Sequence, residues 1–541
     1  MATTLGRFVT KFKAKGNILR NKRGLCTKPP AHEALPTTGI KFKTDVHNLA
    51  GPRERIESFS WLSQHGPQFQ IRGDQVQVIT EPAQFYEILK ASKNFGTDLF
   101  LNINSKRRIT FASLYLGNGS LEKDLVSSIR EACLAAVLSG NSNFEVNILL
   151  DYTRGSRGKV NSRSMLRPLM AEFSSVKVSL FHTPDLRGFL KKIMPDRFNE
   201  TIGLTHVKVY LFDDSFVISG ANLSHDYFTN RQDRYILFND CPEIAEFFNE
   251  LVKGIMSFSF SLSPDNSLYL SPNWNIHPYK GSDGGLQFKQ AARKKIHACL
   301  HLGEKNGNEN TNSRRKVDRP DDKFSHGKGS TDTVVYPLVQ MGSFNVTHDE
   351  QAMLGLLRSS KPQDHILLAS GYFNLTEHYM SVILDQSLGK FSILMASPQA
   401  NGFLGAKGIA GAIPYSYIYL AHQFYKQVCK RKQTKRIHMM EYVRDGWTFH
   451  GKGLWYYLPS QPLPTFTLVG SPNFGYRSVY RDLECQIAIV TENKHLQEQL
   501  REEHVRMFSS SQLVTESTFQ RRDRYVPLWI RYVTKLIKNF F

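Results

Sequence analysis

Two short segments of this chain combine a histidine and a lysine at the same spacing. His206 and Lys208 begin the stretch HVKVYLFDDSFVISGAN, and His450 and Lys452 begin HGKGLWYYLPSQPLPTFTLVGSPN. In a β-strand, residues i and i+2 point to the same face, so each histidine is expected to emerge beside its lysine. An imidazole can attack phosphorus or carry a proton near neutral pH, and an ammonium can neutralise a phosphate oxygen. The two pairs therefore predict phosphodiester transfer.

Further polar residues follow each pair. Asp213 follows the first pair and can accept a hydrogen bond from the far nitrogen of a histidine. Asn222 and Asn473 each come directly after a glycine turn and are neutral groups suited to phosphate oxygens or to the lysine. Two histidines allow one to become phosphorylated while the other protonates the leaving group. Neither segment carries carboxylates at metal-ligand spacing, so we predict that the core chemistry needs no metal or other cofactor, and a dependence on divalent metal is left open.

On these residues the sequence resembles the phospholipase D superfamily, whose signature is His-x-Lys-x4-Asp-x6-Gly-(Ser/Gly)-x-Asn. The first segment matches at five positions, with Ala221 in the serine place and the asparagine one position early: His206, Lys208, Asp213, Gly220 and Asn222. The second segment also matches at five positions: His450, Lys452, Gly470, Ser471 and Asn473. Tyr457 stands where its aspartate would be.

Within that superfamily, four phrases are most similar to the eukaryotic phosphatidylglycerophosphate synthases: ASGYFN (369–374), ASPQANGF (396–403), HGKGLWYY and YRDLECQ. This resemblance covers about residues 110–500. It implies two α/β domains related by a pseudo-twofold axis, with the active site between them. It also implies that a phosphatidyl group moves from CDP-diacylglycerol to glycerol 3-phosphate through a phosphohistidine, giving phosphatidylglycerophosphate and CMP. The catalytic residues would be His206, Lys208, Asp213, His450 and Lys452.

Substrates that carry a pyrophosphate and a phosphomonoester suit a cationic cleft. Arg154 and Arg157 are candidates for lining this cleft, and the alternative is that they are ordinary surface charges. The predicted substrate-binding residues are Asn222, Ser471, Asn473, Arg481 and Glu484. Asp482 and Glu484 share a face of a predicted strand, so they either orient the second histidine or lysine or form a structural ion pair.

The turn LGNGSLEK (116–123) contains a weaker candidate for nucleotide phosphate binding, formed by Gly117, Gly119 and Ser120. It lacks the Gly-Lys-Ser/Thr of a P-loop. A plain glycine turn in which Ser120 is the N-cap of the next helix is the alternative.

The composition indicates a folded, basic protein of several domains. The 541 residues contain 69 Lys+Arg and 48 Asp+Glu, a net charge of +21, and 41% are hydrophobic. The six cysteines stand singly, which excludes a disulfide-stapled secreted scaffold and any CxxC zinc site. No apolar run approaches the roughly 20 residues that a spanning helix needs.

Residues 1–32 contain eight basic side chains and no acid, which is typical of a mitochondrial presequence; the alternative is a basic arm that binds nucleic acid. Removing them lowers the net charge from +21 to +13, so an anionic partner is expected. We therefore predict a mitochondrial protein, peripheral on the matrix side of the inner membrane and associated with anionic lipid, with no nucleic-acid partner.

The predicted order of segments is a presequence (1–32), a lead segment (33–100), a first phospholipase D-like domain (101–300), a disordered polar linker (303–333), a second such domain (334–510) and a tail (511–541). Strands are expected in the first domain at 110–116, 145–150, 176–181, 207–212 and 235–238, with a helix at 121–139. In the second domain they are expected at 366–370, 391–396, 436–442, 454–458, 466–469 and 485–490. This alternation predicts α/β layers.

The tail has an amphipathic pattern after Pro527. Its apolar stripe consists of Trp529, Val533, Leu536, Ile537 and Phe540, while Arg531, Lys535 and Lys538 lie largely off that stripe. Such a helix can lie in an anionic membrane interface or dock on the second domain of the protein itself.

Three other functions compete with the phosphatidyltransferase. A phosphodiesterase or nuclease of the same superfamily would also suit a basic chain, although no recognition module is evident. A degenerate scaffold is suggested by Tyr457, but the intact His450 and Lys452 argue against it. A phosphatidylserine or cardiolipin synthase would use the same chemistry, and the residues alone do not reveal the acceptor alcohol.

Overall fold

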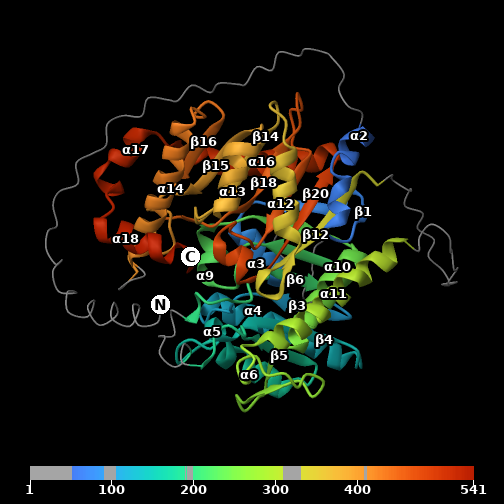
Figure 1. Ribbon diagram of the computed structural model, residues 1–541. Coiled ribbons are helices and arrows are strands. Elements are labelled where there is room, and N and C mark those ends of the chain that lie inside the picture. The colour runs from blue at the N-terminus through green and yellow to red at the C-terminus, as the bar shows by residue number, and fades with distance from the viewer. Residues whose placement is uncertain are drawn as a thin grey trace.

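The computed structural model describes residues 52–90, 105–188, 191, 199–308, 331–406 and 411–540. The predicted presequence lies outside these ranges, as does most of the predicted linker. Two large sheets dominate the structure, the first drawn in blue to green and the second mainly in yellow to red (Figure 1).

The first sheet has three parallel central strands, with antiparallel strands on both sides. Its strands run in the order β11 (Leu268–Leu270), β10 (Phe260–Leu262), β5 (Val176–Phe181), β4 (Glu145–Asp151), β3 (Arg108–Ala112), β6 (Val209–Phe212), β7 (Ser215–Ser219), β9 (Tyr235–Phe238) and β2 (Val76–Ile79). The central strands are buried almost throughout, as expected for a sheet covered on both faces.

The second sheet repeats this arrangement. Its strands run in the order β1 (Phe69–Ile71), β12 (Thr333–Met341), β20 (Leu483–Thr491), β19 (Phe466–Gly470), β18 (Lys452–Tyr457), β14 (His365–Ser370), β15 (Lys390–Ala396), β16 (Ile437–Tyr442) and β21 (Ser511–Leu513). β14, β15 and β16 are parallel, and β18 lies antiparallel beside β14 as β6 lies beside β3. His206 and His450 therefore precede corresponding strands. The pseudo-twofold axis itself stays a prediction.

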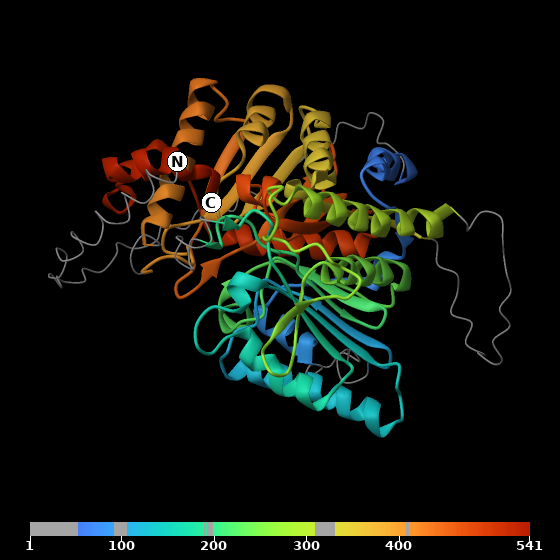
Figure 2. The same cartoon turned by 60° about the horizontal axis from the view of Figure 1, so that its bottom comes forward.

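Helices fill three layers around the two sheets. The outer layer of the first sheet contains α3 (Pro82–Lys90), α4 (Ser120–Leu138) and α6 (Ser162–Glu172), and that of the second contains α12 (His348–Ser359) and α14 (Ile413–Lys430). Between the sheets lie α10 (Pro242–Ser257), α11 (Leu286–Asn308) and α16 (Lys494–Ser509), which share one apolar core with both sheets (Figure 2). The halves are therefore packed as one body.

Shorter helices lie at the edges and turns of this framework. They are α2 (Pro52–Glu57), α5 (Tyr152–Gly155), α9 (His225–Thr229), α13 (Glu377–Ser381), α15 (Tyr476–Tyr480), α17 (Glu516–Gln520) and α18 (Leu528–Ile537). No helix in the described ranges is long and apolar enough to cross a membrane.

Three predicted boundaries differ from the structure. Residues 303–308 belong to α11 rather than to the predicted linker. The predicted tail begins with β21, which is the edge strand of the second sheet. The lead segment contributes β1 to the second sheet and β2 to the first, so it joins the halves.

Candidate active site

The two histidines lie where the halves exchange backbone hydrogen bonds. His206 N donates to Leu483 O (2.7 Å), and His450 N donates to Gln232 O (2.8 Å). The short strands β8 (Arg231–Gln232) and β17 (Thr448–Phe449) pair in parallel just before His450. His206 and His450 are only 5% and 4% exposed. The structure thus brings both predicted histidines into one buried seam.

Each histidine contacts a carboxylate of the opposite half. His206 Nδ1 lies 2.9 Å from Glu484 Oε2, and His450 Nδ1 lies 2.6 Å from Asp233 Oδ2. All four side chains are buried. A carboxylate that accepts from Nδ1–H fixes the tautomer and leaves Nε2 for chemistry. Glu484, predicted to bind substrate or to orient the second histidine, thus orients the first one instead.

The two lysines lie beside their histidines as the spacing predicted. Lys208 Nζ donates to His206 O and Lys452 Nζ to His450 O, each at 2.8 Å. Lys452 Nζ also lies 2.6 and 3.0 Å from the two ring nitrogens of His450. Both ammonium groups are almost completely buried. Positive charge is therefore concentrated where a phosphate would meet the imidazoles.

Burial sets the protonation of this cluster. It lowers the pKa of His206 and of His450 well below the ordinary value, and the neighbouring Lys208 and Lys452 ammonium groups act in the same direction. It also lowers the pKa of Lys208 to about 7 and of Lys452 to about 8, despite the acids nearby. The imidazoles are thus neutral near pH 7, and an arriving phosphate would favour fully charged lysines.

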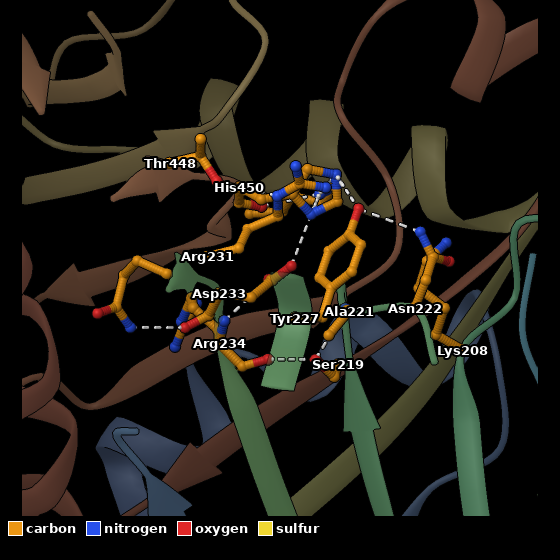
Figure 3. Close-up of polar contacts among 12 residues, drawn as sticks. Lys208, Ser219, Ala221, Asn222, Tyr227, Arg231, Asp233, Arg234, Thr448 and His450 are labelled. Carbon is orange, nitrogen blue, oxygen red and sulfur yellow. Dashed lines mark hydrogen bonds and ion pairs between the residues drawn. The ribbon is translucent and has the colours of Figure 1, made fainter. Parts of the chain in front are cut away.

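A phenol connects His450 to the first half (Figure 3). Tyr227, on α9, accepts from Asn222 Nδ2 (3.1 Å), and its hydroxyl lies 3.3 Å from His450 Nε2. Because the amide donates to this oxygen, the hydroxyl hydrogen is available to Nε2. Tyr372 meets the same imidazole edge-on, with ring centroids 5.6 Å apart. Two aromatic rings therefore fix the second histidine.

Two arginines that the sequence reading did not select lie next to the histidines. Arg231 Nε donates to Thr448 Oγ1 (3.0 Å), and its guanidinium lies over the Tyr227 ring, 4.6 Å from the centroid. Arg477 pairs with the buried Asp482 (2.8 Å) and contributes positive potential at His206. They are better placed than Arg481, which donates to Thr201 O and lies over Phe540.

Asp213 does not reach His206. It directly follows β6, about 20 Å along an extended chain from the histidine. Its carboxylate accepts from the backbone N–H groups of Lys106, Arg107 and Arg108, and its φ is +52°. The predicted catalytic role is therefore wrong for this geometry, since Asp213 closes a turn at the start of β3.

Tyr457, in the corresponding place of the second segment, also points away from the histidines. Its hydroxyl hydrogen-bonds to His504 on α16. His450 has its carboxylate from Asp233, so the change to tyrosine removes nothing from the second pair. The observation that suggested a degenerate scaffold thus has a structural explanation.

The other predicted ligands divide into two groups. Asn222 and Asn473 are at the seam, each with a buried Oδ1 that has no partner within the described residues. Ser471 instead exchanges two hydrogen bonds with the backbone of Cys485 and ties β19 to β20. Arg154 lies over the Tyr115 ring and Arg157 pairs with Glu200, so both already have partners.

The glycine turn before α4 is occupied by a carboxylate. A Cβ on Gly117 or on Gly119 would collide with the buried side chain of Glu122, which accepts from His225 N (2.7 Å). A phosphate cannot share this space with an anion, so the predicted nucleotide contact is wrong. The N-cap of α4 is Gly119 rather than Ser120, and it makes no side-chain cap bond.

The functional candidates that sequence reasoning missed are Tyr227, Arg231, Asp233 and Arg477. One signal was available for the carboxylate, because Asn222 and Asp233 are eleven residues apart, as are Asn473 and Glu484. Extending the internal repeat past the asparagines would have found it. Within the described ranges, no three His, Cys, Asp or Glu residues are grouped so that they could hold a metal ion.

Comparisons with known proteins show which chains this one is similar to. The chain is 47% identical over 499 residues to the mitochondrial CDP-diacylglycerol–glycerol-3-phosphate 3-phosphatidyltransferase of Gallus gallus, and 45% over 496 residues to that of Homo sapiens. Each alignment covers 90% of this chain and 87% of the relative. No family model matches.

Among solved structures, the phosphatidylserine synthase of Haemophilus influenzae superposes with a TM-score of 0.62 at 17% identity, covering 91% of this chain and all of that one. At this identity the likeness concerns the fold alone. The α/β fold expected from the phospholipase D resemblance is confirmed.

Proposed function

The chain belongs to the family of CDP-diacylglycerol–glycerol-3-phosphate 3-phosphatidyltransferases, and we propose that it transfers the phosphatidyl group of CDP-diacylglycerol to glycerol 3-phosphate. The products are phosphatidylglycerophosphate and CMP. One observation supports this proposal most directly. His206 and His450 lie at one seam, each beside a lysine and each hydrogen-bonded to a carboxylate of the opposite half.

In the first step, Nε2 of the neutral His206 attacks the phosphorus that bears the diacylglycerol. The bond from this phosphorus to the bridging oxygen breaks, and that oxygen leaves with CMP after taking the Nε2 proton of His450, which enters this step as the imidazolium because the negative charge of the bound substrate favours its protonated form. Glu484 stabilises the cationic ring of the phosphohistidine through Nδ1. Lys208 and Lys452 neutralise the phosphoryl oxygens in the transition state.

In the second step, His450 takes the proton of a hydroxyl of glycerol 3-phosphate, and the oxygen attacks the same phosphorus. The P–N bond breaks, and His206 returns to its neutral form. Depressed pKa values suit this cycle, because one ring must be neutral to attack and the other must readily release its proton. The residues themselves supply nucleophile, acid and charge, so we propose that the core chemistry needs no metal or other cofactor.

We place the protein in the mitochondrion, peripheral on the matrix side of the inner membrane. Residues 1–32 support import, and the exposed aromatic face of α18 supports contact with anionic lipid. Deleting 1–32 should abolish import while the purified protein keeps its activity. Normal import of the shortened chain would refute the presequence.

The decisive experiment gives the purified protein CDP-diacylglycerol with glycerol 3-phosphate, serine or phosphatidylglycerol as acceptor. CMP release that depends on glycerol 3-phosphate is expected. Dependence on serine or phosphatidylglycerol would assign a sister synthase, and salt-sensitive cleavage of DNA would assign a nuclease.

The histidine roles are tested by mapping the labelled phosphohistidine with mass spectrometry. His206→Ala should abolish both turnover and label, whereas His450→Ala should cripple turnover but retain some label from a substrate whose leaving group needs no proton. A label on His450 in the unmodified protein would reverse the two roles.

A further inference from the structure

A basic cavity lies under the C-terminal helix, outside the set of residues that contact the two histidines. Its volume is about 460 Å³, and α14, α17, the turn Arg522–Arg524 and α18 surround it. Its basic lining comprises His422, Arg521, Arg522, Arg524 and Arg531, and its aromatic lining comprises Tyr419, Phe519 and Tyr525. Four arginines around one cavity are more than the neighbouring acids neutralise, as the ion pairs show.

Two of these arginines are used in structural ion pairs. Arg524 is 3% exposed and bridges Asp523 (2.6 Å) and Glu441 (2.5 Å), while Arg521 pairs with Asp523 (2.8 Å). The Nε atom of Arg524 is a buried donor without a partner in the described part of the chain. These contacts hold Arg521 and Arg524 in the wall of the cavity.

The other two arginines keep unneutralised charge. Neither Arg522 nor Arg531 forms an ion pair within the described ranges, and Arg531 uses only Nε, on the carbonyl of Val526 (2.9 Å). The nearest acid to His422 is Glu516, 3.9 Å from Nε2. The cavity therefore carries excess positive charge and suits a phosphate group, which guanidinium binds in bidentate fashion.

An apolar strip leads away from the cavity. Leu528, Tyr532 and Leu536 are spaced by four along α18, and each is more than half exposed, as is Tyr525 at the cavity rim. Ile530 and Thr534 on the opposite face are buried against α14, where Thr534 Oγ1 donates to Ser416 Oγ (2.9 Å). Docking thus holds the helix in place with its aromatic and aliphatic face outward.

We propose that this cavity binds the phosphate headgroup of an anionic phospholipid, with the acyl chains along the strip Leu528–Tyr532–Leu536. A free phosphate would use the arginines but not the strip, and the combination of both is what a membrane-interface site presents. The inference rests on the proposed peripheral membrane association and names the lipid contact that produces it.

The cavity is connected to the histidine seam through the end of the chain and α15. The turn after α18, Lys538–Phe540, packs on α15, and Arg481 at the end of α15 lies over the Phe540 ring at 4.1 Å. α15 carries Arg477, which contributes to the potential at His206. A lipid held at the cavity would therefore bring the seam close to the membrane from which the lipid substrate comes.

The test compares binding of the full chain to phosphatidylcholine vesicles with and without phosphatidylglycerol. The double variant Arg522→Gln/Arg531→Gln should lose about 30-fold in affinity for the anionic vesicles, which corresponds to two basic residues at a membrane surface. The control Lys294→Gln/Lys295→Gln removes the same charge from exposed positions on α11 and should lose far less. Transferase activity in detergent micelles should stay within twofold for both.

Equal losses for the variant and its control would overturn the lipid site, since general charge would then explain binding. Displacement of the protein from vesicles by millimolar inorganic phosphate would assign the cavity to free phosphate. Leu528→Ser/Tyr532→Ser should weaken vesicle binding without changing phosphate binding, and unchanged vesicle binding would refute the strip. Because micelle activity is measured in parallel, failure of the transferase proposal is distinguishable from failure of the lipid site.

Discussion

Each histidine at the seam depends on a carboxylate that its own half does not supply. Glu484 reaches across to His206 and Asp233 to His450, while the aspartate of the sequence signature, Asp213, holds a turn. Burial raises the pKa of Asp233 to about 6, and it also raises that of Glu484. Burying a carboxylate costs free energy, and an imidazole and a lysine beside each of these two acids offset that cost.

Replacing Glu484, which contacts His206 from the opposite half, should reduce catalysis far more than replacing Asp213, the aspartate of the sequence signature. Glu484→Gln removes the anion that fixes the His206 tautomer, and we expect kcat to fall roughly 10²- to 10⁴-fold. Asp213→Asn weakens three backbone contacts 105 to 107 residues away in sequence and should lower the thermal midpoint with kcat within about tenfold. Steady-state CMP release and thermal unfolding of both variants check this, and a larger kcat loss for Asp213→Asn would contradict it.

Tyr227 is predicted to tune the second histidine. Its hydroxyl donates to His450 Nε2 and so favours the neutral ring. Tyr227→Phe removes that donor, which should raise the pKa of His450 and move the alkaline limb of the kcat profile to higher pH. We also expect kcat to fall about tenfold, the equivalent of one lost hydrogen bond.

Tyr210→Phe is the matched control for this change. Tyr210 is equally buried and donates to Ala221 O (2.6 Å), but it contacts neither histidine. Both variants should lose similar stability, and only Tyr227→Phe should move the pH profile. Parallel shifts in the two profiles would show that Tyr227 has a structural role alone.

Among the secondary-structure elements, strands with continuous apolar runs were predictable and strands with an interruption were not. The predicted strand 176–181 coincides with β5, and 235–238 with β9. β12 was not among the predicted strands; Pro337 lies inside it, and proline argues against a central strand. Here β1 begins opposite Val335, so Pro337 has no partner in β1. Contacts between distant segments decide such cases.

The pairing of each carboxylate with the histidine of the opposite half could not be predicted, for a related reason. Sequence spacing gives the residues that share a strand face, but Glu484 and His206 are 278 residues apart and meet only because the sheets pack together. The position of each lysine beside its histidine could be predicted, because residues two apart in an extended chain lie on the same face.

The contact between β18 and α16 has a pH dependence of its own. Tyr457 at the end of β18 bonds His504 on α16, and burial together with Arg234 lowers the pKa of His504 to about 3. In the unfolded chain the imidazole of His504 binds a proton near pH 6.5, whereas in the folded chain it binds one only near pH 3. Folding stability is therefore lost as the pH falls through this window, by about 1.4 kcal/mol per unit.

His504→Gln should remove this dependence. At pH 7.5 the variant loses packing and is expected to melt several degrees below the unmodified protein. At pH 5 the difference should shrink, because only the histidine protein is penalised by protonation of its unfolded state. Thermal midpoints at both pH values test this, and a difference that stays constant would contradict the assignment.

At the scale of the whole molecule, the two halves are joined by polar contacts as well as by a common core. Arg234, which directly precedes β9 of the first half, donates to both oxygens of Glu503 on α16 (2.9 and 2.8 Å). It also donates to Leu468 O (2.7 Å) and to Thr467 Oγ1 (2.8 Å). Its guanidinium lies 3.9 Å from the centre of the Trp455 ring. The pair is almost completely buried, and Arg234 immediately follows Asp233, the partner of His450.

Glu503→Gln is therefore predicted to loosen the seam as well as the fold. Removing one partner leaves a buried, unpaired guanidinium, at a cost of about 3–5 kcal/mol. The exposed pair Arg130–Glu172 on α4 and α6 is the control, and Glu172→Gln should change the stability far less, because water screens exposed ion pairs. Calorimetry should show a large drop in the unfolding temperature for Glu503→Gln and little for Glu172→Gln. Because Arg234 positions Asp233, kcat should fall as well at temperatures where the variant is still folded. A Glu503→Gln protein with unchanged melting and turnover would refute the view that this ion pair holds the two halves in register.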